Sequence, residues 1–355
     1  MTRPVTQPMT RPQSRPLTPL LRPATVDLDE QGRLLVPGTR TPVPETRVAE
    51  QLARDLRIPR RATDVYVYVH GWQTSPAAAD RAAGRLITRA AALHRTRPGH
   101  YPGLSAGFRP WCVVVRWPSS SLPSLGGYRR IRDRAHAMSA RGQAGRVLGH
   151  LLGYLDQERG DPAVPGVLAN RNGQYLHLVG HSFGGRFLCE AVQYAADRPA
   201  APQVLGWSRP ADPRRPFTVD SMLVFQMAAP RNAFEHLFPR LFAAGPLGAP
   251  LRGPLVLTHS RFDRATGFWH LRAEGRPGIG HSGVGAAPIR QFSTSLRPTG
   301  SPYPHAVLDH PLVNINADDV YRGGRAARLA PAGAHSDFQR PESAHLLLSL
   351  AAHSR

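Results

Sequence analysis

The feature that most constrains this chain is a short apolar run that passes through a glycine-rich turn into an amphipathic helix. Residues 175–179 (YLHLV) indicate a buried strand, and GHSFGG follows at 180–185. One apolar stripe at helical spacing then comprises Phe187, Leu188, Ala191, Val192 and Ala195. A strand followed at once by a helix is the repeating unit of α/β domains. This segment therefore predicts a sheet covered by helices.

The same alternation recurs along the chain. Further strands are expected at 65–69, 111–117, 221–227, 254–258 and 311–315. Helices are expected near 48–56, after Ser75-Pro76, around 147–155, after GHSFGG, and at 342–352. Continuous apolar strands separated by helices are typical of parallel sheets that are buried on both sides. The predicted fold class is α/β, with a mostly parallel sheet and helices on both faces.

The N-terminal segment has a different composition. Residues 1–45 are rich in proline and arginine, which predicts a disordered tail, with a weak hairpin signal around Gln31-Gly32. Residues 46–355 form the expected α/β domain, with possible lid elements near 231–253 and 275–288. The second of these is too glycine-rich for a packed element and is expected to be a mobile flap.

Composition narrows the classes of function. The formal net charge is +21, but all 45 basic residues are arginine and they are scattered along the chain, which argues against a nucleic-acid function. No apolar run approaches the roughly 18 residues that span a membrane, and the first residues lack a secretory signal. The expected location is the cytoplasm. The two cysteines, Cys112 and Cys189, lie in apolar runs and are expected to be buried thiols.

The glycine-rich turn suggests a nucleophile. Residues 180–184 match G-x-S-x-G, with Ser182 at the centre, directly between a strand and a helix. In such a turn the serine has a strained backbone conformation that lifts its hydroxyl above the sheet. Side chains two positions away would collide, so Gly180 and Gly184 meet a steric demand. The alternative is an ordinary glycine-rich turn.

A serine hydroxyl needs a base, and the base needs an acid that orients it. With the chain order Ser, acid, His, the acid is expected just after a later strand, where Asp263 lies; Asp318 and Asp319 are its rivals. His335 follows the last strand and precedes the final helix, which favours it as the base. The rival histidines are His281, His305 and His310.

Acyl transfer also needs N–H groups that stabilise an oxyanion. One is expected from Phe183, the residue after the nucleophile. The second is expected from Trp72, in the HGWQTS segment that follows the strand at 65–69. His70 is then a residue that shapes this loop and not a base. The alternative is a tight turn before a helix.

Together these segments resemble a known family. HGWQTS after one strand, RWPSSS after the next, GHSFGG, SRFD and a late GAHSDF are similar to the bacterial α/β-hydrolases of unassigned function. The resemblance extends from about Val65 to the end of the sequence. It implies an α/β-hydrolase fold and a Ser-Asp-His triad that maps onto Ser182, Asp263 and His335. It also implies that no metal or cofactor is needed.

Two apolar features concern the substrate. The run at 231–245 places Phe234, Leu237 and Phe238 at helical spacing after the strand at 221–227. These residues are candidates for lining an acyl pocket or a lid, and the alternative is a helix that packs its stripe on the sheet. The expected partner is a small-molecule acyl substrate.

The function expected from sequence is a serine hydrolase that cleaves a carboxylic ester through an acyl-enzyme. A thioesterase or acyltransferase would use the same triad and stays open as an alternative. A non-catalytic binding module with a basic tail is the alternative from another class.

Overall fold

The computed structural model describes residues 21–122, 124–138, 142–159, 174–197, 219–242, 251, 253–324 and 330–355. Its centre is one eight-stranded sheet in the order β1-β3-β2-β4-β5-β6-β8-β7, in which all paired strands are parallel. The strands are β1 (Ala24–Asp27), β2 (Asp64–Val69), β3 (Pro110–Arg116), β4 (Tyr175–His181), β5 (Ser221–Phe225), β6 (Leu255–His259), β7 (Gln291–Ser295) and β8 (Leu312–Asn316).

The predicted fold class, an α/β domain with a mostly parallel sheet, is confirmed. All six expected strands are present within two residues of their expected ends. The two edge strands, β1 and β7, were not expected. β1 lies inside the segment 1–45 that was expected to be a tail. Val26, Leu28 and Leu34 of this segment are buried in the core, and their burial holds it against the sheet. Residues 1–20 of that predicted tail are outside the described ranges.

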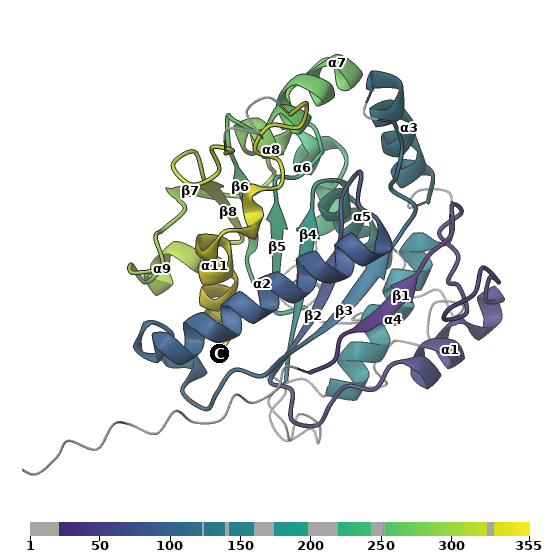
Figure 1. Cartoon of the computed structure of the whole chain (residues 1–355), viewed down its shortest axis with the longest axis horizontal. Helices are drawn as coiled ribbons and strands as arrows, with labels where there is room; N and C mark the ends of the chain where they lie inside the picture. Colours follow the sequence, from purple (N-terminus) through teal and green to yellow (C-terminus); the bar gives the residue numbers. More distant parts are fainter. Residues whose placement is uncertain are drawn as a thin grey trace, which may run out of the picture.

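Helices cover both faces of the sheet. In Figure 1, α2 and α11 lie in front of the sheet and α4 and α5 behind it, while α3 and α7 lie at the end where the strands finish. The helices are α1 (Val48–Asp55), α2 (Pro76–Thr96), α3 (Leu125–His136), α4 (Ala144–Arg159), α5 (Phe183–Asp197), α6 (Ala233–His236), α7 (His270–Glu274), α8 (Ile279–Ser282), α9 (His305–Leu308) and α11 (Pro341–His353). Short 3-10 and π turns complete the path: η1 (Glu45–Arg47), η2 (Pro98–His100), η3 (Pro102–Leu104), η6 (Pro239–Leu241), η7 (Ala265–Trp269) and η8 (Asp337–Gln339). The predicted start of α2 is confirmed, because Ser75 Oγ accepts the Ala78 N–H at 3.3 Å.

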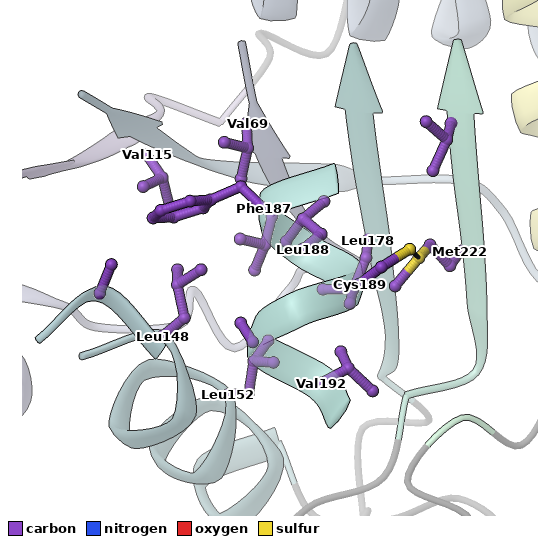
Figure 2. Packing of buried hydrophobic residues seen from close by; sticks show 14 of the residues in the cluster. Val69, Val115, Leu148, Leu152, Leu178, Phe187, Leu188, Cys189, Val192 and Met222 are labelled. Atoms are coloured by element: carbon purple, nitrogen blue, oxygen red, sulfur yellow. Dashed lines mark hydrogen bonds between the residues drawn. The ribbon is translucent and has the colours of Figure 1, made fainter. Parts of the chain in front are cut away.

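The central strands bury both faces, as β2 shows. Val65, Val67 and Val69 of β2 face the core under α4 and α5, and Tyr66 and Tyr68 face the core under α2 and α11. Figure 2 shows the stripe of α5 between the strands and α4, with Leu188, Val192 and their neighbours in contact. Burial of each such side chain contributes about 1.5–3 kcal/mol. This packing fixes the start of α5, and with it the turn that contains Ser182.

A buried ion pair lies at the opposite end of the sheet. Asp64 begins β2 and is fully buried, and the Arg355 guanidinium donates to its two carboxylate oxygens at 3.1 and 3.0 Å. The same guanidinium lies 4.3 Å from the centre of the Tyr175 ring. Burial alone would raise the pKa of Asp64, but the hydrogen bond from His177 and the charge of Arg355 hold it below its ordinary value.

We predict that Arg355→Met destabilises the fold by about 3 kcal/mol, because it leaves the Asp64 carboxylate buried without its cation. Urea denaturation at pH 7 measures the loss. The matched control is Arg322→Met, which removes an exposed pair with Asp319 and is expected to cost less than about 1 kcal/mol. Equal losses in the two variants would contradict the structural role of the buried pair.

Candidate active site

Ser182 occupies the turn between β4 and α5. Its φ is +57°, in the left-handed region that a side chain makes costly, and it is 2% exposed. Its backbone N–H donates to the carbonyl of Phe225 at 3.0 Å, which fixes the turn against β5. A strained residue at the carboxyl end of a central strand is a common feature of functional sites.

Three glycines make this turn possible. A Cβ at Gly184 would lie 2.2 Å from the Val69 carbonyl oxygen, and one at Gly185 would lie 2.0 Å from Val224 Cγ1. A Cβ at Gly180 would lie 2.5 Å from the Gly185 Cα. The steric demand expected at Gly180 and Gly184 is therefore present in the structure. The first turn of α5 packs directly against the ends of β2 and β5.

Asp263 and His335 form a buried pair at the same end of the sheet, where the strands finish. Asp263 follows β6 and His335 lies in the loop before α11, and His335 Nδ1 donates to Asp263 Oδ2 at 2.8 Å. The Thr266 backbone N–H donates to the other carboxylate oxygen at 3.0 Å. Burial alone would raise the pKa of Asp263, but the charge of His335 and these hydrogen bonds hold it below its ordinary value. In the neutral form of the ring, an Nδ1–H that donates to the carboxylate leaves the lone pair on Nε2.

His181 joins this pair to the serine turn. It precedes Ser182, its Nε2–H donates to the His335 carbonyl at 2.8 Å, and the two rings are 4.7 Å apart. Burial, followed by the charge of His335, lowers the pKa of His181 to about 3, so this ring stays neutral. His335 Nε2 is buried and has no hydrogen-bond partner within the described part of the chain. Ser182 and His335 are thus brought together, but no hydrogen bond joins their side chains.

The HGW loop is held by the WPSSS segment. His70 Nδ1 donates to the Gly71 carbonyl at 3.0 Å, and its Nε2 accepts the Trp117 backbone N–H at 3.2 Å. Burial lowers the pKa of His70 to about 4. Trp117 Nε1 returns a hydrogen bond to the His70 carbonyl at 2.8 Å. His70 is therefore a neutral residue whose Nδ1 and Nε2 both make hydrogen bonds to main-chain groups, one in its own loop and one in the WPSSS segment.

This loop approaches Ser182 at Gly71. A Cβ at Gly71 would lie 2.5 Å from Ser182 Cβ, so only glycine fits there. Gln73 has a φ of +60°, and its N–H donates to the Ser119 carbonyl at 3.0 Å. The Trp72 indole donates to Ser121 Oγ at 2.7 Å. Among the described residues, the backbone N–H groups of Trp72 and Phe183 have no acceptor.

The rival residues lie elsewhere or have other partners. Asp318 accepts from the Arg261 N–H, and Asp319 pairs with Arg322. The His281 ring makes a hydrogen bond with the backbone oxygen of Asp263, at 3.1 Å, and not with its carboxylate. The His305 ring lies against His353 at a tilt of 45°, and His310 stacks on Phe292. Of these residues none joins a carboxylate to the Ser182 turn.

A second Ser–His–Asp set, which the sequence did not indicate, lies at the opposite end of the sheet, where the strands begin. His177 Nδ1 is 2.8 Å from Ser221 Oγ, and its Nε2 is 3.2 Å from Asp64 Oδ1. Asp64 and Ser221 are the first residues of β2 and β5, whereas Ser182 follows the last residue of β4. Ser221 is on a strand, not in a strained turn, and Arg355 already neutralises the carboxylate. Ser221 therefore lacks the strained turn that contains Ser182.

The substrate candidates have different positions. Phe234 and Phe238 are fully buried in the core, with ring centres 5.7 Å apart, and Leu237 is 37% exposed. The helix expected over the whole run is short, because Pro239 starts a 3-10 turn after α6. This is the packing alternative, and a substrate role for these residues stays a prediction. Residues 243–250 of the predicted lid are outside the described ranges.

The segment 275–288 is not an open flap. Gly278 N–H donates to the Thr266 carbonyl at 2.7 Å and Gly280 N–H to the Met227 carbonyl at 2.9 Å, and Ile279 is fully buried. A Cβ at Gly280 would lie 2.6 Å from the Gln226 carbonyl carbon. These glycines permit close packing, which composition alone does not distinguish from flexibility, and a lid role for the segment stays a prediction.

Two smaller expectations can be compared directly. Cys112 and Cys189 are buried free thiols, as predicted, and burial raises the pKa of Cys112 to about 12. No described helix combines the length and the hydropathy that spanning a membrane requires.

Comparison with known proteins adds little. No family model matches the chain, and no curated protein matches it. Among solved structures, phospholipase PlaB from Legionella pneumophila in complex with thio-NAD is similar, with 11% identity and a TM-score of 0.25. The similarity covers 57% of this chain and 39% of the phospholipase chain. At this TM-score the likeness does not assign the site, which rests on the residues described above.

The buried neutral histidines predict a loss of stability in acid. The unfolded ring takes up a proton below its ordinary pKa of 6.5, whereas folded His70 stays neutral down to about 4 and His181 to about 3. Their contribution is present above pH 6.5 and is lost as the pH falls towards those values, at about 1.4 kcal/mol per pH unit for each ring. Urea unfolding at pH 7, 6 and 5 measures this slope. His70→Gln removes one of these rings and is expected to reduce the slope by about 1.4 kcal/mol per pH unit. An unchanged slope would contradict a neutral folded ring.

Proposed function

We propose that this chain is a serine hydrolase that cleaves a carboxylic ester through an acyl-enzyme. The observation that carries the proposal is the strained Ser182 turn, at the same sheet edge as the buried Asp263–His335 hydrogen bond of 2.8 Å. In this proposal Ser182, which is 2% exposed, is the nucleophile, and the pair supplies an oriented base. The resemblance in HGW, WPS and GHSFGG supports the same chemistry.

In the proposed mechanism, His335 Nε2 takes the proton of the Ser182 hydroxyl as Oγ attacks the ester carbonyl carbon. The Asp263 carboxylate holds the Nδ1–H and stabilises the imidazolium that forms. The tetrahedral intermediate collapses, its bond to the alcohol breaks, and the imidazolium gives its proton to the leaving alkoxide. A water then attacks the acyl carbon, with His335 again as base. The bond to Ser182 Oγ breaks, the imidazolium returns its proton to Oγ, and the carboxylic acid leaves.

The backbone N–H groups of Phe183 and Trp72 are the proposed oxyanion donors. Both are without an acceptor among the described residues, and Gly71 lies against Ser182 between them. Donors that are fixed before the reaction stabilise the developing charge without reorganisation. The His70–Trp117 hydrogen bonds fix the loop that contains the second donor.

Labelling with a fluorophosphonate probe tests the proposal. We expect covalent labelling of the wild type and none of Ser182→Ala. We expect a loss on the order of 10⁴-fold in the ester kcat of His335→Ala, because the nucleophile loses its base. Mass spectrometry identifies the labelled residue, and hydrolysis of p-nitrophenyl butyrate gives the rate.

Ser221→Ala is the matched control for that experiment. It removes the serine of the second Ser–His–Asp set and is expected to keep full labelling at Ser182. Labelling that persists in Ser182→Ala, or that is lost only in Ser221→Ala, would overturn the proposed nucleophile.

A second prediction concerns the oxyanion donors. Gly71→Ala places a methyl group 2.5 Å from Ser182 Cβ, which pushes the Trp72 N–H out of position. We expect kcat for the butyrate ester to fall on the order of 10²-fold, as on loss of one donor. Gly84→Ala is the control, because its new methyl group meets open space on α2. Wild-type turnover in a folded Gly71→Ala variant would argue against this donor.

A further inference from the structure

Gln226 has an unusual position that no sequence pattern indicated. It directly follows β5, it is fully buried, and its φ is +49°. Its backbone N–H donates to the Thr258 carbonyl at 3.1 Å, which holds the residue between the ends of β5 and β6. Besides Ser182 and Gln73, it is the third described non-glycine residue with a positive φ. All three lie at the edge of the sheet where the proposed site is.

The side-chain amide of Gln226 bridges the proposed acid and the chain next to the base. Its Nε2 donates to Asp263 Oδ2 at 3.1 Å and to the Ala334 carbonyl oxygen at 3.1 Å. The two N–H bonds of one amide group are thus both used. Asp263 Oδ2 is the same oxygen that accepts from His335 Nδ1. Ala334 directly precedes His335, so the amide fixes the acid and the backbone of the base relative to each other.

The surroundings hold the backbone of Gln226 closely. Gly280 packs against the Gln226 backbone so closely that a Cβ there would lie 2.6 Å from the Gln226 carbonyl carbon. Gly280 N–H also donates to the Met227 carbonyl at 2.9 Å, and its carbonyl accepts the Ser260 N–H at 2.8 Å. The segment between α7 and β7 therefore clamps Gln226, and a clamped donor fixes a carboxylate better than a mobile one.

We infer that Gln226 is a positioning residue of the proposed hydrolase, which fixes the Asp263 carboxylate and the His335 loop in one geometry. The inference rests on the proposed function. A neutral amide suits this place, since it donates to a carboxylate without adding charge to a buried pair. A carboxyl group there would face Asp263 as a like charge, and a hydrocarbon would leave the Ala334 carbonyl and Asp263 Oδ2 with one donor fewer.

The first test is Gln226→Leu, which keeps the volume and removes both hydrogen bonds. We expect kcat for p-nitrophenyl butyrate to fall about 10- to 100-fold with KM within about threefold of wild type, because the base is misplaced and the substrate contacts are not. The rate of fluorophosphonate labelling at Ser182 is expected to fall in parallel.

Gln174→Leu is the matched control. Gln174 is also buried, and its Nε2 also donates to two backbone carbonyls, those of Pro59 and Ala62, at 3.1 and 3.0 Å. It precedes β4 at the opposite end of the sheet from Ser182. A purely structural role for Gln226 predicts that both variants lose stability and that both keep the wild-type kcat per folded molecule.

The second test, Gln226→Glu, adds a readout that a structural role does not change. A protonated carboxyl can still donate to Asp263, whereas an ionised one repels it. We therefore expect kcat/KM near that of wild type at low pH, and a new falling limb as the pH rises through the pKa of the introduced group. The wild type and Gln174→Glu are expected to lack this limb.

The outcomes separate the two proposals. If the wild type is not labelled at Ser182, the proposed function fails. If the wild type is labelled while folded Gln226→Leu keeps its kcat, the positioning role fails and the function stands. If Gln226→Leu does not fold, Gln226→Glu decides, and a pH profile that superimposes on the wild-type profile overturns the inference.

Discussion

The close approach of main chain around Ser182 is the constraint on which the proposed site depends. Gly184 lets α5 begin against the carbonyls that end β2, and Gly71 then lies directly against Ser182. These two close contacts together set the serine turn and the loop that contains Trp72. The conformation is strained, and strain of this kind persists only where the surroundings over-determine it. The buried strands and the apolar stripe of α5 supply that rigidity.

The histidines show why residue identity alone does not define such a site. His70 and His181 are buried and neutral, and each makes a hydrogen bond to a backbone carbonyl and, within the described ranges, none to a carboxylate. His335 combines a carboxylate on Nδ1 with an Nε2 that has no partner among the described residues. His177 also lies between a serine and an aspartate, but Arg355 balances that aspartate. What separates the two Ser–His–Asp sets is the backbone around the serine.

The sequence predicted the parts of this architecture that depend on burial and spacing. Strands such as β2 were recognisable because they are apolar on both faces, whereas β7 (QFSTS) is half exposed at an edge and has no such signal. The sequence placed Ser182, Asp263 and His335 in regions that meet in space. It could not indicate Gln226, because one polar residue after a strand has no period. Nor could it distinguish the close packing of Gly280 from flexibility.

Phe234 and Phe238 pack in the core, and the role expected for them concerns the choice of substrate and not the acyl transfer itself. In the proposed mechanism the residues around Ser182 transfer the acyl group, while Phe234 and Phe238, from the run expected to select that group, pack in the core. The ring of Tyr128 in α3, which is buried as well, lies 5.2 Å from the rings of Trp72 and of Phe183. This ring packing supports the fixed geometry of the Trp72 loop and of the first turn of α5, and a substrate role for Phe234 and Phe238 stays a prediction.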